Sequence, residues 1–388
     1  MKLIPMLSLP VLFLSVTACT GDSDEKQASN VVESAFVENP DQYADPDTCG
    51  TLGVKSVPVL VPDLNQLIEV SDYTALKTAL DSGYAYVKVP NGVTIEIPNQ
   101  PGALSVGASQ TLFGERGRAA QPGKLLVLPN SGIDEDRYPV MTLASHARVT
   151  GLIIEGPSQV SDTLKSTIAM QSQSDAVGIV VDNNEIFGWP WAGVSLKRSR
   201  DSQISHNFIH HNIKSELGYG VVVQNGETTA DIRCNIFNHN RHAIAGSGAL
   251  GEGYTASYNL VMQGGGKDAY HQFDMHEKDG YGGSYVHVYN NWFNYGDFGT
   301  ANRSSIMIRA IPQQGSIEVT GNVFKSAVEI SPGRPTVAGV AGSVPDEAAL
   351  KENNQFAQVF EFLREEADQC VMKVAGQTIP VHCQSVSL

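Results

Sequence analysis

Asn184-Glu-Ile-Phe-Gly-Trp-Pro-Trp-Ala-Gly-Val-Ser-Leu-Lys-Arg-Ser-Arg-Asp-Ser-Gln-Ile-Ser-His-Asn-Phe-Ile209 begins and ends with one short pattern, an asparagine followed by an apolar pair or near pair. The pattern returns four more times along the chain, at Asn235-Ile-Phe237, Asn259-Leu-Val261, Asn291-Trp-Phe293 and Asn322-Val-Phe324. Successive asparagines are separated by 23, 28, 24, 32 and 31 residues. The chain therefore contains an internal repeat.

A second apolar run lies in each repeat: Gly193-Val-Ser-Leu196, Gly220-Val-Val-Val223, His242-Ala-Ile-Ala245, Gln272-Phe-Asp-Met275, Ile306-Met-Ile308 and Val328-Glu-Ile330. Repeats of about 20–35 residues that hold only short strands and turns predict a solenoid. The regular leucines of leucine-rich repeats are missing, and a propeller blade needs about 40 residues. We therefore expect an all-β parallel β-helix, in which the asparagines stack on one another at equivalent turns.

The chain on either side of the repeat predicts how the solenoid starts and ends. Residues 71–82 have apolar side chains at helical spacing, and residues 84–89, 93–97 and 125–128 read as strands. We expect a short capping helix followed by the first coils, with the β-helix spanning residues 49–345. In residues 346–388 we expect a helix with Ala349, Phe356, Phe360 and Leu363 on one face, and a disulfide-linked cap.

Residues 1–18 resemble a bacterial lipoprotein export signal: Lys2, an apolar stretch over residues 7–16, and the box Val16-Thr17-Ala18-Cys19. The resemblance implies that Cys19 is lipidated and becomes the first mature residue. Thr20 in the next position resembles sorting to an outer membrane, on its periplasmic or cell-surface face. Residues 19–48 are acidic and poor in aliphatics, so we expect a tether there.

The other cysteines are Cys49, Cys234, Cys370 and Cys383, a number compatible with two disulfides in an exported protein. Cys370 and Cys383 bracket a short strand-like stretch and are expected to pair. The partner of Cys49 is left open, because Cys234 lies inside a repeat and fits a buried thiol equally well. No pair of cysteines has the spacing of a zinc site.

Net charge gives no sign of nucleic-acid binding. The formal charge is −15, and much of it comes from the tether and from the acidic stretch after residue 345. There is no basic run or stripe of the kind that binds phosphates. Because solenoid ends are expected to be capped, we expect a monomer.

Two stretches carry most of the plausible chemistry: Tyr270-His-Gln-Phe-Asp-Met-His-Glu277 and Asn238-His-Asn-Arg-His242. If Phe273 and Met275 alternate into the core, then Gln272, Asp274 and His276 point together to the outer face. A carboxylate and an imidazole would then lie side by side.

Alignment of the second runs predicts which side chains meet, since equivalent positions on neighbouring coils lie about 4.8 Å apart. One column on the outer face contains Lys197, Gln224, His276 and Arg309, and a parallel column contains Ser195, Val222, Asp274 and Met307. Arg241 and His242 enter the coil just before these residues. The predicted patch contains Arg241, His242, Asp274, His276 and Arg309.

Phe273-Asp274-Met275-His276-Glu277 resembles the Asp-Pro-His-Asp/Glu motif of mannuronan C5-epimerases, with Met275 in place of the proline. That family commonly has a tyrosine three residues before the aspartate. Here His271 holds that position and Tyr270 precedes it. The resemblance implies a right-handed parallel β-helix related in fold to pectate and alginate lyases, acting on a uronic-acid polysaccharide.

The residues of the patch also fit this chemistry without the resemblance. Removing the proton next to a uronate carboxylate builds negative charge, so the site needs a cation, a base and a proton donor. Arg241 or Arg309 could neutralise the carboxylate, and His276 or His242 could act as base, tuned by the neighbouring aspartate. Tyr270 or the second histidine could protonate the leaving glycosidic oxygen. We predict a lyase that cleaves an acidic polysaccharide by β-elimination.

Other functions fit the same patch. Reprotonation from the opposite face would make the protein a C5-epimerase. A glycoside hydrolase would use two carboxylates, such as Asp274 with Glu277 or Asp297. A non-catalytic polysaccharide-binding lipoprotein would have a loosely packed patch with ordinary pKa values.

Further residues are candidates for binding the polysaccharide: Arg309, Lys197, His271, Gln224, Trp189 and Trp191. The two tryptophans could stack on sugar rings, and Lys197, three coils from His276, suits a distant charged subsite. Asp274, His276 and His242 could also ligate a divalent ion. We assign no metal ligands and leave calcium open, since there is no contiguous Asp-rich calcium loop.

Overall fold

The computed structural model describes residues 49–129, 136–158, 165–265, 269–295, 304–313, 316–331, 338–344, 346–365 and 369–386. The predictions for the export signal, for Cys19 and for the tether fall on residues 1–48, outside the described residues. Within the described residues, no helix combines the length and the apolar character that crossing a membrane would require.

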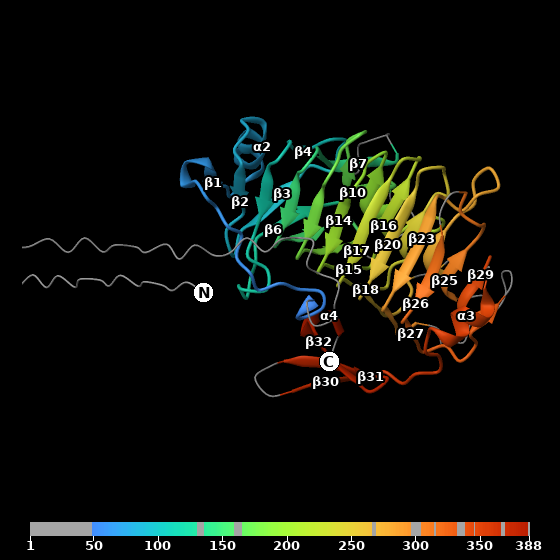
Figure 1. Ribbon diagram of the computed structural model, residues 1–388. Helices are drawn as coiled ribbons and strands as arrows, with labels where there is room; N and C mark the ends of the chain where they lie inside the picture. The colour runs from blue at the N-terminus through green and yellow to red at the C-terminus, as the bar shows by residue number, and fades with distance from the viewer. Residues whose placement is uncertain are drawn as a thin grey trace, which may run out of the picture. The chain divides into compact units, whose positions relative to one another are not determined.

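Three parallel sheets run side by side through the described chain, and successive coils add one strand to each (Figure 1). The first sheet contains β1 (Leu67–Glu69), β2 (Tyr86–Lys88), β5 (Thr111–Phe113), β8 (Arg148–Thr150), β11 (Val180–Asp182), β14 (Ser202–Ser205), β17 (Thr229–Arg233), β20 (Gly253–Ser257), β23 (Tyr285–Tyr289) and β26 (Ile317–Thr320). The second contains β4 (Leu104–Val106), β7 (Tyr138–Leu143), β10 (Thr167–Ser172), β13 (Ala192–Lys197), β16 (Tyr219–Gln224), β19 (His242–Gly246), β22 (His271–Met275), β25 (Ser304–Ile308), β29 (Ala338–Gly342) and β28 (Ile330–Ser331). The third contains β3 (Thr94–Ile97), β6 (Lys124–Val127), β9 (Ile153–Glu155), β12 (Glu185–Phe187), β15 (Phe208–His210), β18 (Ile236–Asn238), β21 (Leu260–Val261), β24 (Trp292–Phe293) and β27 (Val323–Phe324). The predicted right-handed parallel β-helix is confirmed.

The remaining elements lie at the two ends of the described chain. Near the start are the 3₁₀ helix η2 (Leu64–Gln66) and α2 (Tyr73–Asp81), and after the last coils come α3 (Glu347–Glu352) and α4 (Cys383–Val386). β30 (Glu361–Arg364), β31 (Cys370–Val374) and β32 (Gln377–Val381) form a separate antiparallel sheet (Figure 1). The predicted N-terminal helix is α2, where the Asp72 carboxylate accepts a hydrogen bond from the Ala75 N–H and so caps the first turn.

The C-terminal helix is much shorter than the apolar pattern predicts. α3 ends at Glu352, so Phe356 and Phe360 lie beyond it and Leu363 belongs to β30. The chain instead continues the stack of the solenoid, because the Phe356 ring packs on Phe324 with the centroids 4.9 Å apart. The spacing of the apolar residues after Asp346 fits a helical face, but it fits a further layer of the aromatic stack equally well, so the sequence alone could not distinguish the two.

The repeated asparagines form a buried ladder, as predicted. The backbone N–H of each asparagine from Asn184 to Asn322 donates to the Oδ1 of the asparagine one coil further on, and the ladder ends at Asn354. The Nδ2 groups donate to backbone carbonyls of neighbouring turns. The amides therefore satisfy turn groups that would otherwise be buried without partners.

Replacing Asn259 with alanine is expected to lower the free energy of unfolding by about 2–4 kcal/mol. Its Oδ1 accepts from the N and the Nδ2 of Asn235, at 3.1 and 3.0 Å. Its Nδ2 donates to the Ile232 carbonyl and to Asn291, at 2.8 and 2.9 Å. Guanidinium unfolding measures the loss. The exposed Asn353 is the control, because Asn353→Ala removes no side-chain bond, and equal stability of the two variants would count against the ladder as a source of stability.

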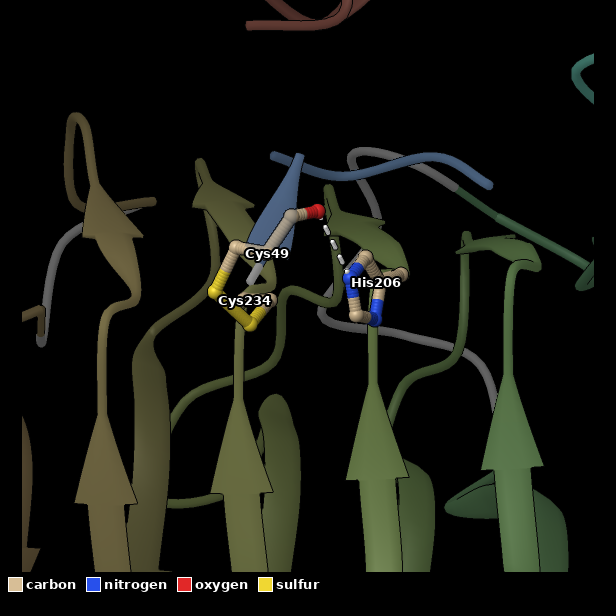
Figure 2. Close-up of side chains that lie close together, drawn as sticks. All are labelled: Cys49, His206 and Cys234. Atoms are coloured by element: carbon tan, nitrogen blue, oxygen red, sulfur yellow. Dashed lines mark hydrogen bonds between the residues drawn. A yellow bond between two sulfur atoms is a disulfide. The ribbon is translucent and has the colours of Figure 1, made fainter. Parts of the chain in front are cut away.

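Two disulfides fix the ends of the described chain. Cys370 and Cys383 are bonded as predicted. Cys49 and Cys234 are bonded to each other, so Cys234 is not the buried thiol that its place in the repeat allowed. Figure 2 shows this bond beside His206, whose Nε2 lies 3.0 Å from the Cys49 carbonyl oxygen. These three residues could gather around a metal only after reduction, because thiolates are the ligands and both sulfurs are in the disulfide.

Candidate functional site

The outer face of the second sheet brings the predicted patch together across β19, β22 and β25. The register pairs Ala245 with Asp274 and Asp274 with Met307. Phe273 and Met275, on either side of Asp274, are both fully buried in the core, as the alternation predicts. The apolar neighbours thus hold the Asp274 carboxylate on the outer face.

The predicted column of charged residues also has the predicted register. Lys197 pairs with Gln224 across β13 and β16. Met275 pairs with Ile308 across β22 and β25, which places His276 beside Arg309 at the next position.

Asp274 is the centre of the cluster, and its carboxylate is fully buried. Arg309 binds it with two hydrogen bonds, from Nε to Oδ1 at 3.0 Å and from Nη2 to Oδ2 at 2.6 Å. The Nε2 of His276 lies 3.0 Å from Oδ2, and the Nε2 of His242 lies 3.6 Å from the same oxygen. One carboxylate therefore binds a guanidinium and lies within 4 Å of two imidazoles.

The carboxylate of Asp274 stays ionised in spite of its burial. Burial alone would raise the pKa of Asp274, but the contacts with His276 and Arg309 hold that pKa well below its usual range. The contact between Asp274 and Arg309 also changes the pKa of Arg309. Burial lowers that pKa, but the Asp274 carboxylate outweighs burial and raises it above the ordinary value. Asp274 is thus a fixed negative charge and cannot act as a general acid.

His242 is buried and electrically neutral. Its Nδ1 makes a short hydrogen bond with the backbone carbonyl of His271, so Nδ1 must carry the proton and Nε2 the lone pair. Burial lowers the pKa of His242 to about 3, and the Asp274 carboxylate opposes that shift only in part. Because the side chain is 1% exposed, a polymer cannot reach it, and of the two predicted bases only His276 fits.

His276 is the imidazole of the pair that solvent and substrate can reach, with 35% of its side chain exposed. Its Nε2 faces the buried carboxylate. A proton on Nε2 would be held by Asp274, and the lone pair would then lie on Nδ1, the other ring nitrogen. This is the arrangement in which a carboxylate orients a histidine for proton transfer.

A metal ion fits this cluster poorly. His242, Asp274 and His276 have ligand atoms within 4.8 Å of one another, which is the set that the sequence singles out for a divalent ion. However, Arg309 occupies both oxygens of Asp274, so a divalent cation would lie directly against a guanidinium. The charges favour proton chemistry over metal binding.

Strict alternation is broken along one column of the second sheet, where two consecutive residues face the core; in β10 these are Ala169 and Met170. Ala243 and Ile244 are consecutive residues of β19, and both lie in the core. Since Ile244 pairs with Phe273, Gln272 occupies the position equivalent to Ala243. It is 1% exposed and its amide donates to the Arg241 carbonyl at 3.4 Å, so the predicted exposure of Gln272 on the outer face is wrong.

A stack of aromatic rings occupies the part of the outer face on which Gln272 was expected. The rings of Tyr219 and His242 lie nearly parallel with centroids 5.7 Å apart, and the His271 ring continues the stack at 6.1 Å. His271 is buried, and its Nδ1 lies 2.7 Å from the Ser304 hydroxyl. It therefore positions the stack and does not present a surface to substrate.

Tyr219 is a residue of the site that the sequence analysis missed. It pairs with His242 across β16 and β19, and Arg241 lies over its ring at 5.9 Å from the centroid. Burial raises the pKa of Tyr219, and the positive charge of Arg241 opposes that shift. The repeat did contain the signal. When Val221 is aligned with Ile244, Tyr219 takes the position of His242 one coil earlier.

Arg241 is a second cation next to the cluster residue His242 in the sequence. Among the residues that the structure describes, no Asp or Glu forms an ion pair with it, and its Nη1 lies 3.5 Å from the Leu217 carbonyl. Tyr270, just before β22, is 38% exposed, and its ring lies beside His271 with the centroids 6.3 Å apart. Arg241 and Tyr270 thus stand directly before β19 and β22, next to the ring stack of Tyr219, His242 and His271.

The remaining predicted binding residues lie elsewhere on the fold. Trp189 is 1% exposed and belongs to the core, so it cannot stack on a sugar. Trp191 is half-buried and packs against the outer face of the second sheet. Gln224 donates to Ser195 at 2.8 Å, and Lys197 is exposed at the end of β13, three strands from β22.

Of the two carboxylates proposed as partners for hydrolysis, Glu277 is exposed. Asp297 lies outside the described residues. Since Asp274 is buried and ionised, it cannot serve either as the acid or as a nucleophile in contact with a sugar, and the hydrolase mechanism finds no support in this geometry.

No protein-family model matches the chain, and no curated protein sequence matches it. Several solved structures are similar to it at low identity, among them the following three. An alginate lyase from Paenibacillus sp. strain FPU-7 is 13% identical with a TM-score of 0.39, over 71% of this chain and 98% of the other. The catalytic domain of a GH87 α-1,3-glucanase in complex with tetrasaccharides is 13% identical with a TM-score of 0.41, over 78% and 70%. The Dettilon tailspike protein is 12% identical with a TM-score of 0.31, over 80% and 76%. At these values the similarity carries no inference about activity.

Proposed function

We propose that the protein is a polysaccharide lyase that cleaves a uronic-acid-containing chain by β-elimination at the Asp274 cluster. The observation that carries the proposal is the pairing of a buried, ionised Asp274 with the accessible His276. Arg241 has no carboxylate partner among the described residues, so it suits an anionic substrate, and an imidazole close to a carboxylate supplies the base.

The roles of the residues follow from their positions. Arg241 binds the uronate carboxylate and stabilises the charge that develops on it. The Nδ1 of His276 removes the proton from the carbon that carries this carboxylate. The electron pair forms the new carbon–carbon double bond and the glycosidic carbon–oxygen bond breaks. Tyr270 gives its proton to the leaving oxygen.

Four further residues act as positioning residues. Asp274 orients His276, Arg309 keeps Asp274 ionised, and His242 with Tyr219 supports Arg241 from below. Tyr219 is a poorer proton donor than Tyr270, because its hydroxyl already donates to the Glu216 carbonyl at 2.9 Å. The close packing and shifted pKa values weigh against a purely non-catalytic patch.

Elimination is tested by following the ultraviolet absorbance of the unsaturated uronate product with a panel of acidic polysaccharides. His276→Ala is expected to lower kcat at least about 100-fold. His287→Ala is the matched control, because His287 lies on β23 of the first sheet and bonds to Ser316 there. If no polysaccharide gives the product, elimination is excluded for the panel, and solvent-proton exchange into the intact polymer would then identify an epimerase.

A further inference from the structure

A cavity of about 580 Å³ lies far along the solenoid from the Asp274 cluster, over the first coils. Its floor is one column of the third sheet, in which the register joins Thr94 to Lys124, Lys124 to Ile153, and Ile153 to Glu185. Three strand spacings make this floor about 14 Å long. The cavity is thus an elongated groove along the solenoid axis, which we name the first-coil groove.

The walls of the first-coil groove come from distant parts of the chain. One wall is residues 116–122, after β5, and the other carries His382 and Gln384 near the C-terminus. The first wall is fixed by backbone bonds, from Arg116 N to the Gly151 carbonyl and from Gly92 N to the Gln121 carbonyl. At Gly117 a Cβ would lie 2.3 Å from the Lys55 carbonyl oxygen, so only glycine fits there. The groove is preformed.

Arg116 lines the groove and is only 3% exposed. Its Nη1 donates to the Gly53 carbonyl at 2.8 Å, and its Nη2 lies 3.3 Å from the Nδ1 of His382. Both partners are neutral. No carboxylate of the described residues forms an ion pair with Arg116, and only the charge of Glu185, on the groove floor, acts on it from a longer distance. A buried charge without a counter-charge in contact is costly, and an anionic ligand would supply one.

His382 also favours an anionic ligand in the groove. Its Nδ1 faces the Arg116 guanidinium, which can only donate, so this nitrogen must keep its lone pair. Burial, reinforced by the charge of Arg116, lowers the pKa of His382 to about 4. The imidazole is therefore neutral at neutral pH, and its Nε2–H is available as a donor.

The charge of the lining is opposite to that of the protein. Arg116, Arg118 and Lys124 line the groove, while Glu185 is its one carboxylate among the described lining residues. Lys124 is paired with Glu155, and Glu185 lies 3.2 Å from the Nε2 of His210. Arg118 is exposed at the rim. In a chain with a formal charge of −15, a groove with these cations is suited to an anion.

We propose that the first-coil groove is a second binding site for a uronate-containing segment of the same polysaccharide, an inference that rests on the proposed function. The groove is much longer than an inorganic anion needs. Its volume falls within the range of about 300–1,000 Å³ in which proteins bind organic ligands. The carboxylate of one sugar pairs with the exposed Arg118 at the rim, where the charge of the buried Arg116 also attracts it, and the neighbouring sugars lie along the floor.

Calorimetric titration of the full-length His276→Ala protein with uronate trisaccharides of mannuronate, guluronate and galacturonate tests the proposal without turnover. Two binding sites per chain are expected. Arg118→Glu is expected to weaken one of them about tenfold or more, and Arg241→Ala the other. Lys77→Glu is the control, because Lys77 is an exposed cation on α2 outside the groove.

The outcomes separate the two proposals. One site that responds to Arg118 and not to Arg241 supports the groove and removes support for the proposed active site. One site that responds only to Arg241 overturns the groove. Binding that Lys77→Glu weakens as much as Arg118→Glu, or no binding of any trisaccharide, also overturns it. Thermal unfolding of each variant shows that a lost site is not a lost fold.

Discussion

Asp274→Asn is expected to lower kcat about a thousandfold and the free energy of unfolding by about 3–5 kcal/mol. The two side chains have the same shape, so no cavity forms. The change removes the negative charge in contact with Arg309, His276 and His242. It also turns an amide N–H₂ toward groups that donate hydrogen bonds, which leaves a partly buried guanidinium without its partner.

Guanidinium unfolding and the elimination assay measure the two effects separately. Asp231→Asn is the control, because burial raises the pKa of Asp231 and its charge is therefore unfavourable in the folded protein. We expect the control to change the unfolding free energy by less than about 0.5 kcal/mol and to leave the rate unchanged. Equal behaviour of the two variants would mean that Asp274 does not organise the cluster. A loss of stability without any detectable elimination activity would leave the structural role intact and count against the lyase.

Acid is expected to destabilise the protein strongly between about pH 6.5 and pH 4. Burial lowers the pKa of His206 and of His242 to about 3, and it lowers that of His211 and of His382 to about 4. The unfolded chain binds protons at these positions below about pH 6.5, while the folded protein does not. Each such histidine therefore lowers the stability by about 1.4 kcal/mol per pH unit as the pH falls.

His206 and His242 alone give a slope of about 3 kcal/mol per pH unit, and the two less buried histidines act in the same direction. Asp274 does not change this window, because its depressed pKa costs stability only below the unfolded value of about 3.9. Chemical unfolding at several pH values measures the slope. His206→Gln is expected to reduce it, since the amide can replace the Nε2 contact with the Cys49 carbonyl and does not titrate. Asn259→Ala is expected to lower stability at every pH with the slope unchanged. A stability that is constant from pH 7 to pH 5 would contradict the burial of these imidazoles.

The sequence was sufficient for the parts of the structure that the repeat controls. The asparagine spacing predicted the ladder, and alignment of the apolar runs placed His276 beside Arg309 and Asp274 beside Met307, residues more than 30 positions apart in the chain. These predictions succeeded because a parallel solenoid converts sequence position directly into spatial position. The pairing of Cys370 with Cys383 could also be predicted from the sequence, since the two cysteines are close along the chain.

What the sequence by itself determined is the coil, its register and the column on which the charged residues lie, because these follow from local apolar patterning repeated at nearly constant intervals. Only the tertiary structure decided which side chains are reachable. The two consecutive inward residues of β19 turn Gln272 away and replace it with a ring stack. Burial separates the inaccessible His242 from the accessible His276. The pairing of Cys49 with Cys234 and the walls of the first-coil groove join segments more than 100 residues apart. These features depend on packing between elements that have no common period, so no local pattern could encode them.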